Sequence, residues 1–168
     1  ILKFFQSKNT VIEMLADRGY NTNISIKDVS IDDYKILLNS QDINFICSNN
    51  DNDNEKIYVK YLLSENKSNY IKESIEKINK EYLVNNENNI IFILKNKPST
   101  SFIKIIQELG CEQFYIENLQ YNITKHKLVS KHVLLNKEQT DNLLNKYNIK
   151  LNQLPVILNT DPVIKYYN

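Results

Sequence analysis

Glycine is almost absent from this chain: Gly19 and Gly110 are the only two among 168 residues. A P-loop, a Rossmann dinucleotide fingerprint and a nucleophile elbow each need glycines at fixed spacing, because their backbones turn tightly or approach a ligand closely. Both glycines here follow helical patterns, where a residue with positive φ can end a helix at little cost. The sequence therefore excludes these three classes of enzyme site.

Cysteine and histidine are equally scarce, with two of each. Cys47 and Cys111 are isolated, which excludes a zinc ribbon, and their apolar surroundings predict buried free thiols in a reducing compartment. His126 and His132 are six residues apart, so they do not share a helical face, and no Cys or acidic residue is close to them in sequence. We therefore expect no metal and no cofactor in this chain.

Long apolar runs and a strong charge of one sign are also missing. No stretch of 18 apolar residues occurs, so we expect no membrane span. The net charge is +1, divided into −3 over residues 1–118 and +4 over residues 119–168. Neither half has the large basic surplus of a protein that binds nucleic acid by itself. Any DNA contact is therefore expected to be local and shared with another protein.

The apolar pattern of residues 1–118 predicts an α/β domain with a mixed sheet flanked by helices. The order strand, helix, strand, helix, strand over residues 42–116 favours this architecture. The run Ile90–Leu94 is almost wholly apolar, which is typical of a central strand buried on both faces. Helices are predicted at 3–18, 30–38, 68–82 and 98–109, and strands at 42–47, 56–62, 89–94, 114–116 and 119–123.

Residues 119–168 predict a second, smaller α/β module. Its one long helix should begin at Asn136, with Gln139 three residues on in a capping-box arrangement. Leu143, Leu144 and Tyr147 are expected to form the buried face of that helix. A segment of about 50 residues is marginal as an independent domain. The module is therefore expected to need the first half, a partner surface or more chain.

A metal-dependent nuclease is the main enzymatic alternative. Such folds commonly place an acid two residues before a Lys on a central strand, where the acid holds Mg²⁺. The corresponding positions here are Tyr58 and Lys60, and a tyrosine does not supply the carboxylate ligand. The pattern therefore disfavours a nuclease.

The segment at residues 122–132 is the most specific run in the chain. Its sequence, Asn-Ile-Thr-Lys-His-Lys-Leu-Val-Ser-Lys-His, closely resembles the signature of the fifth subunit shared by eukaryotic nuclear RNA polymerases, whose C-terminal part matches a small subunit of archaeal RNA polymerase. Further agreement lies at 133–138, 152–155 and 161–163, and Asp17–Tyr20 adds a weaker match. The resemblance therefore covers most of the chain.

Two departures from the family pattern are clear. Ser130 and Lys131 stand where the family usually has Pro and an acid, and Thr160 stands where a Gly is common. The family also continues beyond the position of Asn168 into further strands, so we expect the C-terminal module to be incomplete at its C-terminal end.

The resemblance implies an N-terminal jaw domain at residues 1–118 and a C-terminal assembly domain, similar to the small archaeal subunit, at residues 119–168. The assembly domain would dock on the largest polymerase subunit, and the jaw would lie beside downstream duplex DNA and contact it weakly, without sequence specificity. The DNA-proximal residues would be Lys95, Lys97, Pro98, Ser99, Thr100 and Lys104. The subunit interface would include His126, Lys127, Leu128, Val129, His132, Gln153, Leu154, Pro155, Asp161 and Pro162.

The same resemblance implies a subunit that is not an enzyme by itself and does not form a homo-oligomer. We expect it in the nucleus if it is cellular, and in the host cytoplasm or nucleus and the virion if it is viral. The 26 asparagines suit an AT-rich source, such as a protist or a large DNA virus. A stand-alone regulatory or scaffold protein that carries the assembly module is the remaining alternative.

Overall fold

The structure, a computed structural model, describes residues 1–22, 43–52, 55–63, 68–82 and 89–167. The chain separates into two compact units, Ile1–Tyr121 and Asn122–Asn168. The sequence placed this boundary three residues earlier, after residue 118. Among the described helices, none has the length and apolar character that a membrane crossing requires.

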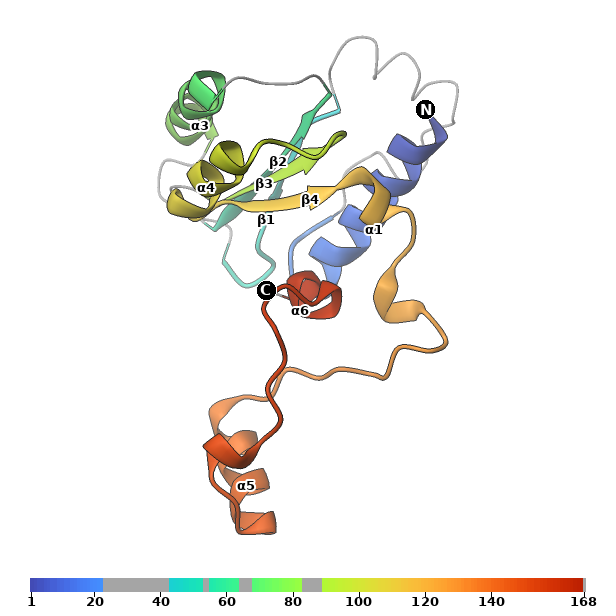
Figure 1. Cartoon of the computed structure of the whole chain (residues 1–168), viewed down its shortest axis with the longest axis vertical. Coiled ribbons are helices and arrows are strands. Elements are labelled where there is room, and N and C mark those ends of the chain that lie inside the picture. The colour runs from blue at the N-terminus through green and yellow to red at the C-terminus, as the bar shows by residue number, and fades with distance from the viewer. Residues whose placement is uncertain (23–42, 53–54, 64–67, 83–88, 168) are drawn as a thin grey trace. The chain divides into compact units, whose positions relative to one another are not determined.

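A four-stranded mixed sheet, in the order β1-β2-β3-β4, forms the centre of the N-terminal unit (Figure 1). β1 (Phe45–Ser48) and β2 (Lys56–Leu62) pair antiparallel as a hairpin. β3 (Ile90–Leu94) and β4 (Glu112–Tyr115) then add in parallel. The predicted mixed sheet is therefore confirmed.

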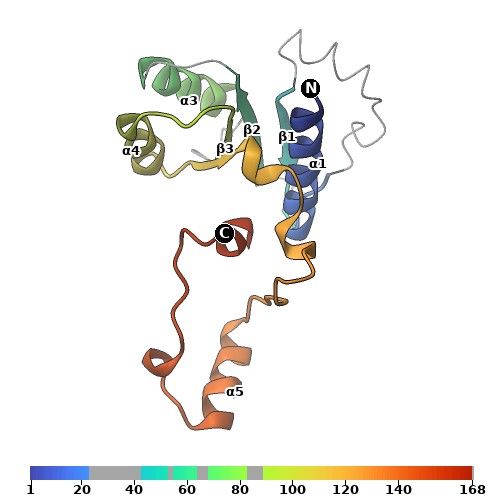
Figure 2. The same ribbon diagram turned by 45° about the vertical axis from the view of Figure 1, so that its right-hand side comes forward.

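Helices cover both faces of this sheet (Figures 1 and 2). α3 (Ser68–Tyr82) and α4 (Thr100–Glu108) lie on one face, and α1 (Leu2–Asp17) lies on the other. All five residues of β3 are buried, as the continuous apolar run predicts. The main core cluster fills the space under α3 and α4 and comprises Leu62, Ile75, Ile78, Ile90, Phe92, Leu94, Phe102, Ile106 and Cys111.

The C-terminal end of α1 is joined to the edge strand β4. Gly19 has φ +87°, which lets the chain turn out of the helix, and Arg18 is the residue just before it. The Arg18 guanidinium donates two hydrogen bonds to the Glu112 carboxylate, at 2.8 and 2.9 Å. This bidentate ion pair connects residues that are 94 positions apart in the sequence. It gives the Asp17–Tyr20 motif a structural role.

The structure differs from the predicted elements at one helix start and one strand. Pro98 does not begin α4: Ser99 is its N-cap and Thr100 its first residue, so the proline lies one position before the cap. The strand predicted at 119–123 is wrong, because Ile116–Leu119 is a 3₁₀ helix, η1, and Ile123–Lys125 another, η2. The helix predicted at 30–38 lies outside the described residues.

The C-terminal unit contains η2, α5 (Lys137–Tyr147), the 3₁₀ helix η3 (Leu151–Gln153) and α6 (Pro162–Tyr167). Its described residues, 122–167, contain no β-strand. The capping box of α5 is confirmed: Asn136 accepts from the Gln139 N–H at 2.8 Å, and Gln139 accepts from the Asn136 N–H at 3.0 Å. The rest of this unit is extended chain and turns on both sides of α5.

Candidate functional site

The first candidate surface is the turn between β3 and α4. Lys95 and Lys97 are exposed, Pro98 is half-buried, and Ser99 and Thr100 are exposed. The Ser99 side chain makes no capping hydrogen bond and instead lies 3.0 Å from the Ser101 hydroxyl. The N–H groups at the start of α4, which have no acceptor within the helix, therefore remain available.

The charge of this turn favours an anion. No acidic residue occurs in the first turn of α4, and Lys104 is exposed one turn further along. The positive end of the helix dipole and three lysines thus lie in one short stretch of chain. The arrangement suits a phosphate group and carries no means of distinguishing one base from another.

The second candidate surface is the segment that begins at Asn122. This side chain is buried, and its Oδ1 accepts hydrogen bonds from the Thr124 N–H at 3.0 Å and the Thr124 hydroxyl at 2.6 Å. Its Nδ2 donates to the Tyr166 hydroxyl at 2.8 Å. The start of the signature segment is therefore fixed to α6, which contacts η2.

The two histidines of the signature hold local turns. The Nδ1 of His126 accepts from the Leu128 N–H at 3.3 Å, whereas the Nδ1 of His132 lies 2.7 Å from the Ser130 carbonyl oxygen. A carbonyl oxygen can only accept, so His132 donates through Nδ1, whereas His126 accepts through that atom. Each of these bonds spans only two residues, so it stabilises the local turn.

Several predicted interface residues also have local roles. Asp161 accepts from the Val163 N–H at 2.8 Å, and Pro162 is the first residue of α6, a position that suits proline because its missing N–H is not needed there. Gln153 accepts from the Lys150 N–H at 2.7 Å, which stabilises η3. Leu154 is half-buried and Pro155 is exposed.

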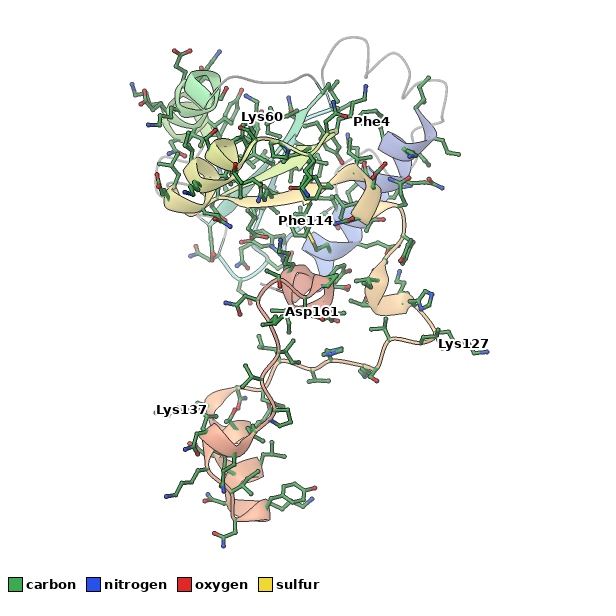
Figure 3. All side chains as sticks on the ribbon, in the orientation of Figure 1. Phe4, Lys60, Phe114, Lys127, Lys137 and Asp161 are labelled. Carbon is green, nitrogen blue, oxygen red and sulfur yellow. The ribbon has the colours of Figure 1, made fainter. Side chains whose placement is uncertain are left out.

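Leu128 and Val129, both predicted at the subunit interface, differ in exposure: Leu128 is 87% exposed, and Val129 is half-buried. The predicted buried face of α5 is wrong, because Tyr147 is 59% exposed and Leu143 and Leu144 are half-buried. Lys127 is exposed as well, and its side chain projects away from the ribbon in Figure 3. These side chains line a surface rather than an interior.

The exposed apolar side chains of the C-terminal unit are the feature that the sequence did not single out. Apart from Leu128, they had no place in the predicted site. They occupy extended chain before α5, α5 itself and the chain after it. The large ones are Leu128, Val133, Leu134, Leu135, Tyr147, Leu151, Val156, Ile157 and Leu158. The sequence indicated this surface only through two short apolar runs, at residues 133–135 and 156–158.

The positions compared with a nuclease strand lie on β2. The side chains of Tyr58 and Lys60 line a groove of about 340 Å³ together with residues of α3, and the Tyr58 ring lies 5.2 Å from that of Tyr82. Across the described ranges, no three His, Cys, Asp or Glu side chains gather closely enough to hold a metal ion.

The two thiols are buried and free, as predicted. Burial raises the pKa of Cys47, and likewise that of Cys111, from 9.0 to about 11. At pH 8 the thiolate fraction falls from about one in ten to about one in a thousand. Alkylation by iodoacetamide at pH 8 should therefore be about 100-fold slower in the folded chain than in urea, as measured by mass spectrometry. Equal rates would contradict this burial.

Comparison with known proteins agrees with the motif and the fold. Residues 1–78 match the family described as RNA polymerase Rpb5, N-terminal domain, and residues 121–168 match RNA polymerase Rpb5, C-terminal domain. The Dictyostelium discoideum subunit rpabc1 of DNA-directed RNA polymerases I, II and III is 29% identical, over 99% of this chain and 85% of its own length.

Relatives from other lineages are similar over the same span. Subunit 5B of the Arabidopsis thaliana polymerases IV and V is 25% identical, over 98% of this chain and 78% of its own length. RPABC1 of Caenorhabditis elegans is 26% identical, over 98% of this chain and 83% of its own length. With both family domains present in order, this chain belongs to the Rpb5 family of DNA-directed RNA polymerase subunits.

Proposed function

We propose that this chain is a non-catalytic polymerase subunit whose C-terminal unit docks on the largest subunit and whose N-terminal unit lies beside downstream DNA. The observation that supports the docking is the exposure of nine large apolar side chains in the C-terminal unit, described above. Among residues 122–167, the part of this unit that the structure describes, only Val163 and Tyr166 are buried hydrophobic residues. A folded chain rarely leaves so much apolar surface uncovered unless a partner or further chain of the same domain covers it.

The docking surface is the arm formed by residues 125–161, which has α5 at its centre. Burying one large apolar side chain contributes about 1.5–3 kcal/mol. Nine such side chains would contribute on the order of 10 kcal/mol, enough to exceed the cost of association in a stable complex. The arm is also basic at its start, where Lys127 and Lys131 are exposed. The partner surface should therefore be apolar with carboxylates at its margin.

Co-expression with the largest subunit of the same polymerase tests this proposal. We expect the chain to remain bound to the tagged largest subunit through a wash at high salt, because apolar burial is not weakened by salt. In isolation we expect a monomer by size-exclusion chromatography. Failure to be retained would instead favour a stand-alone regulatory or scaffold protein.

The lysines of the β3–α4 turn provide the DNA contact in this proposal. Replacing Lys95, Lys97 and Lys104 by Glu should weaken binding of duplex DNA at least tenfold and remove most of its salt dependence. Three phosphate contacts correspond to a slope of about −3 in log affinity against log salt. Fluorescence anisotropy with the free subunit measures both quantities, starting from weak binding by the wild type.

The matched control reverses the charge of three lysines outside the turn. Lys56, Lys72 and Lys80 are exposed lysines of the same unit, outside the turn. Their replacement by Glu changes the net charge equally but should leave most of the binding intact. Equal losses of DNA affinity in the two triple variants would mean that only the overall charge matters. Tight, sequence-specific DNA binding by the wild type would also contradict the proposal.

The proposal includes a location. The similar proteins are subunits of eukaryotic polymerases, which favours the nucleus for a cellular protein of this family. Fluorescent tagging of the chain at its chromosomal locus should place it with the largest subunit. Exclusion from the compartment that contains the largest subunit would contradict the assignment.

A further inference from the structure

One buried hydrogen bond joins the two ends of the C-terminal unit. The Asn122 Nδ2 donates to the Tyr166 hydroxyl at 2.8 Å, across 44 positions of the sequence. Asn122 is 8% exposed and Tyr166 is 3% exposed. Both polar ends of the amide are used, since Oδ1 accepts from Thr124. The side chain of Asn122 is therefore held in one orientation.

Each partner of this bond is fixed by its own local structure. Asn122 is the N-cap of η2. On the other side, Asp161 accepts from the Val163 N–H at 2.8 Å, and the Asp161 carbonyl oxygen accepts from the Lys165 N–H at 2.9 Å. Two short helices, η2 and α6, thus carry one partner each, and the hydrogen bond between them closes the arm, residues 125–161, at its base.

Backbone hydrogen bonds do not hold the two sides of the arm together. No backbone hydrogen bond joins residues 127–135 to residues 149–161, all of which the structure describes. The capping interactions of α5 and η3 are local, each spanning three residues. The apolar runs 133–135 and 156–158 are therefore brought toward a common partner mainly by the base of the arm.

We propose that Asn122 and Tyr166 form a clasp that pre-organises the arm for docking on the largest subunit. This inference rests on the proposed function. With the clasp closed, the loop entropy of residues 125–161 is lost during folding, whereas with the clasp open it would be lost during docking. Asn122 and Tyr166 are thus positioning residues that need not touch the partner.

The fraction of chains with a closed clasp sets the apparent affinity. Tyr166→Phe removes a single hydroxyl group and leaves the ring in place. We expect it to weaken binding to the purified largest subunit about tenfold. The association rate should account for that loss and the dissociation rate should stay within about twofold, because the docked contacts are unchanged. Surface plasmon resonance with the full chain separates the two rates.

A double-mutant cycle tests whether the two residues act as a unit. Asn122→Ala should weaken binding at least as much as Tyr166→Phe, and the double variant should bind no more weakly than Asn122→Ala alone. Asn122→Asp keeps the acceptor for Thr124 and offers a second oxygen to the Tyr166 hydroxyl, so it should recover part of the affinity. Leu128→Ala, a truncation in the arm, should instead raise the dissociation rate.

The outcomes distinguish the clasp from the docking itself. No binding by the wild-type chain would overturn the proposed function. The clasp would be overturned, and the docking would stand, in either of two cases. In the first, the wild-type chain binds and Tyr166→Phe has the same affinity. In the second, the losses of affinity from the two substitutions are additive in the double-mutant cycle. Because Asn122→Ala could unfold the unit, Tyr166→Phe serves as the milder variant. Its folding is checked by amide exchange at Val129 and Gln139, which should be unchanged.

Discussion

Replacing Leu134 and Val156 by Asp together should reduce binding to the largest polymerase subunit at least a hundredfold. Leu134 is 86% exposed and Val156 is 91% exposed, and they lie on the two extended segments that flank α5. Each substitution removes about 1.5–3 kcal/mol of apolar burial and forces a carboxylate into the interface. A combined loss of a few kcal/mol corresponds to two or more factors of ten in affinity.

Quantitative co-purification with a tagged largest subunit measures this loss. The free double variant should keep its circular dichroism spectrum and melting temperature, because both side chains are already exposed. Ile1→Asp with Leu2→Asp is the matched control: these apolar residues of the other unit are 53% and 56% exposed. Equal retention of the arm variant and the control would mean that the arm is not the docking surface.

Elements that depend on local chemistry could be predicted from the sequence. The continuous apolar run of β3 indicated a strand buried on both faces, and all five residues are buried. The Asn136 and Gln139 pair indicated a capping box, which both hydrogen bonds confirm. Gly19 and Gly110 end helices with positive φ. In each case a few neighbouring residues determine the conformation.

Burial in the C-terminal unit could not be predicted in the same way. Helical spacing groups Leu143, Leu144 and Tyr147 on one face of α5, but spacing does not say what covers that face. Tyr147 is 59% exposed in the structure. The same holds for the apolar runs on either side of α5. An apolar pattern is compatible with a core or with an interface, and only the arrangement of the rest of the chain separates the two.

In the candidate site, too, features set by neighbouring residues could be predicted, and features set by distant residues could not. The sequence predicted a turn between a strand that ends at residue 94 and a helix that begins at Pro98. The structure has this turn, with its lysines exposed, but Pro98 precedes the N-cap rather than beginning the helix. Pro restricts its own φ and the residue before it, so the sequence indicates a helix start to within about two residues. The Arg18 and Glu112 pair had no sequence indication, because 94 positions separate its members.

The largest expected effect on stability belongs to Phe92→Ala. Phe92 lies in the middle of β3, is fully buried, and belongs to the cluster under α3 and α4. Truncation of a buried phenylalanine costs about 3–5 kcal/mol, because it loses apolar burial and leaves a cavity. For a unit of this size, that loss lowers the melting temperature by roughly 15 °C.

Urea unfolding followed by circular dichroism measures the loss in the free energy of unfolding. Phe92→Leu is the control, because it fills most of the same volume and should cost only about 1 kcal/mol. Phe114→Ala is a second comparison, since that side chain lies on the edge strand β4 and is only half-buried. A loss below about 1 kcal/mol for Phe92→Ala would contradict the packing of β3 against α3 and α4. The cost should fall in the order Phe92→Ala, Phe114→Ala, Phe92→Leu, because each successive change removes less buried apolar surface.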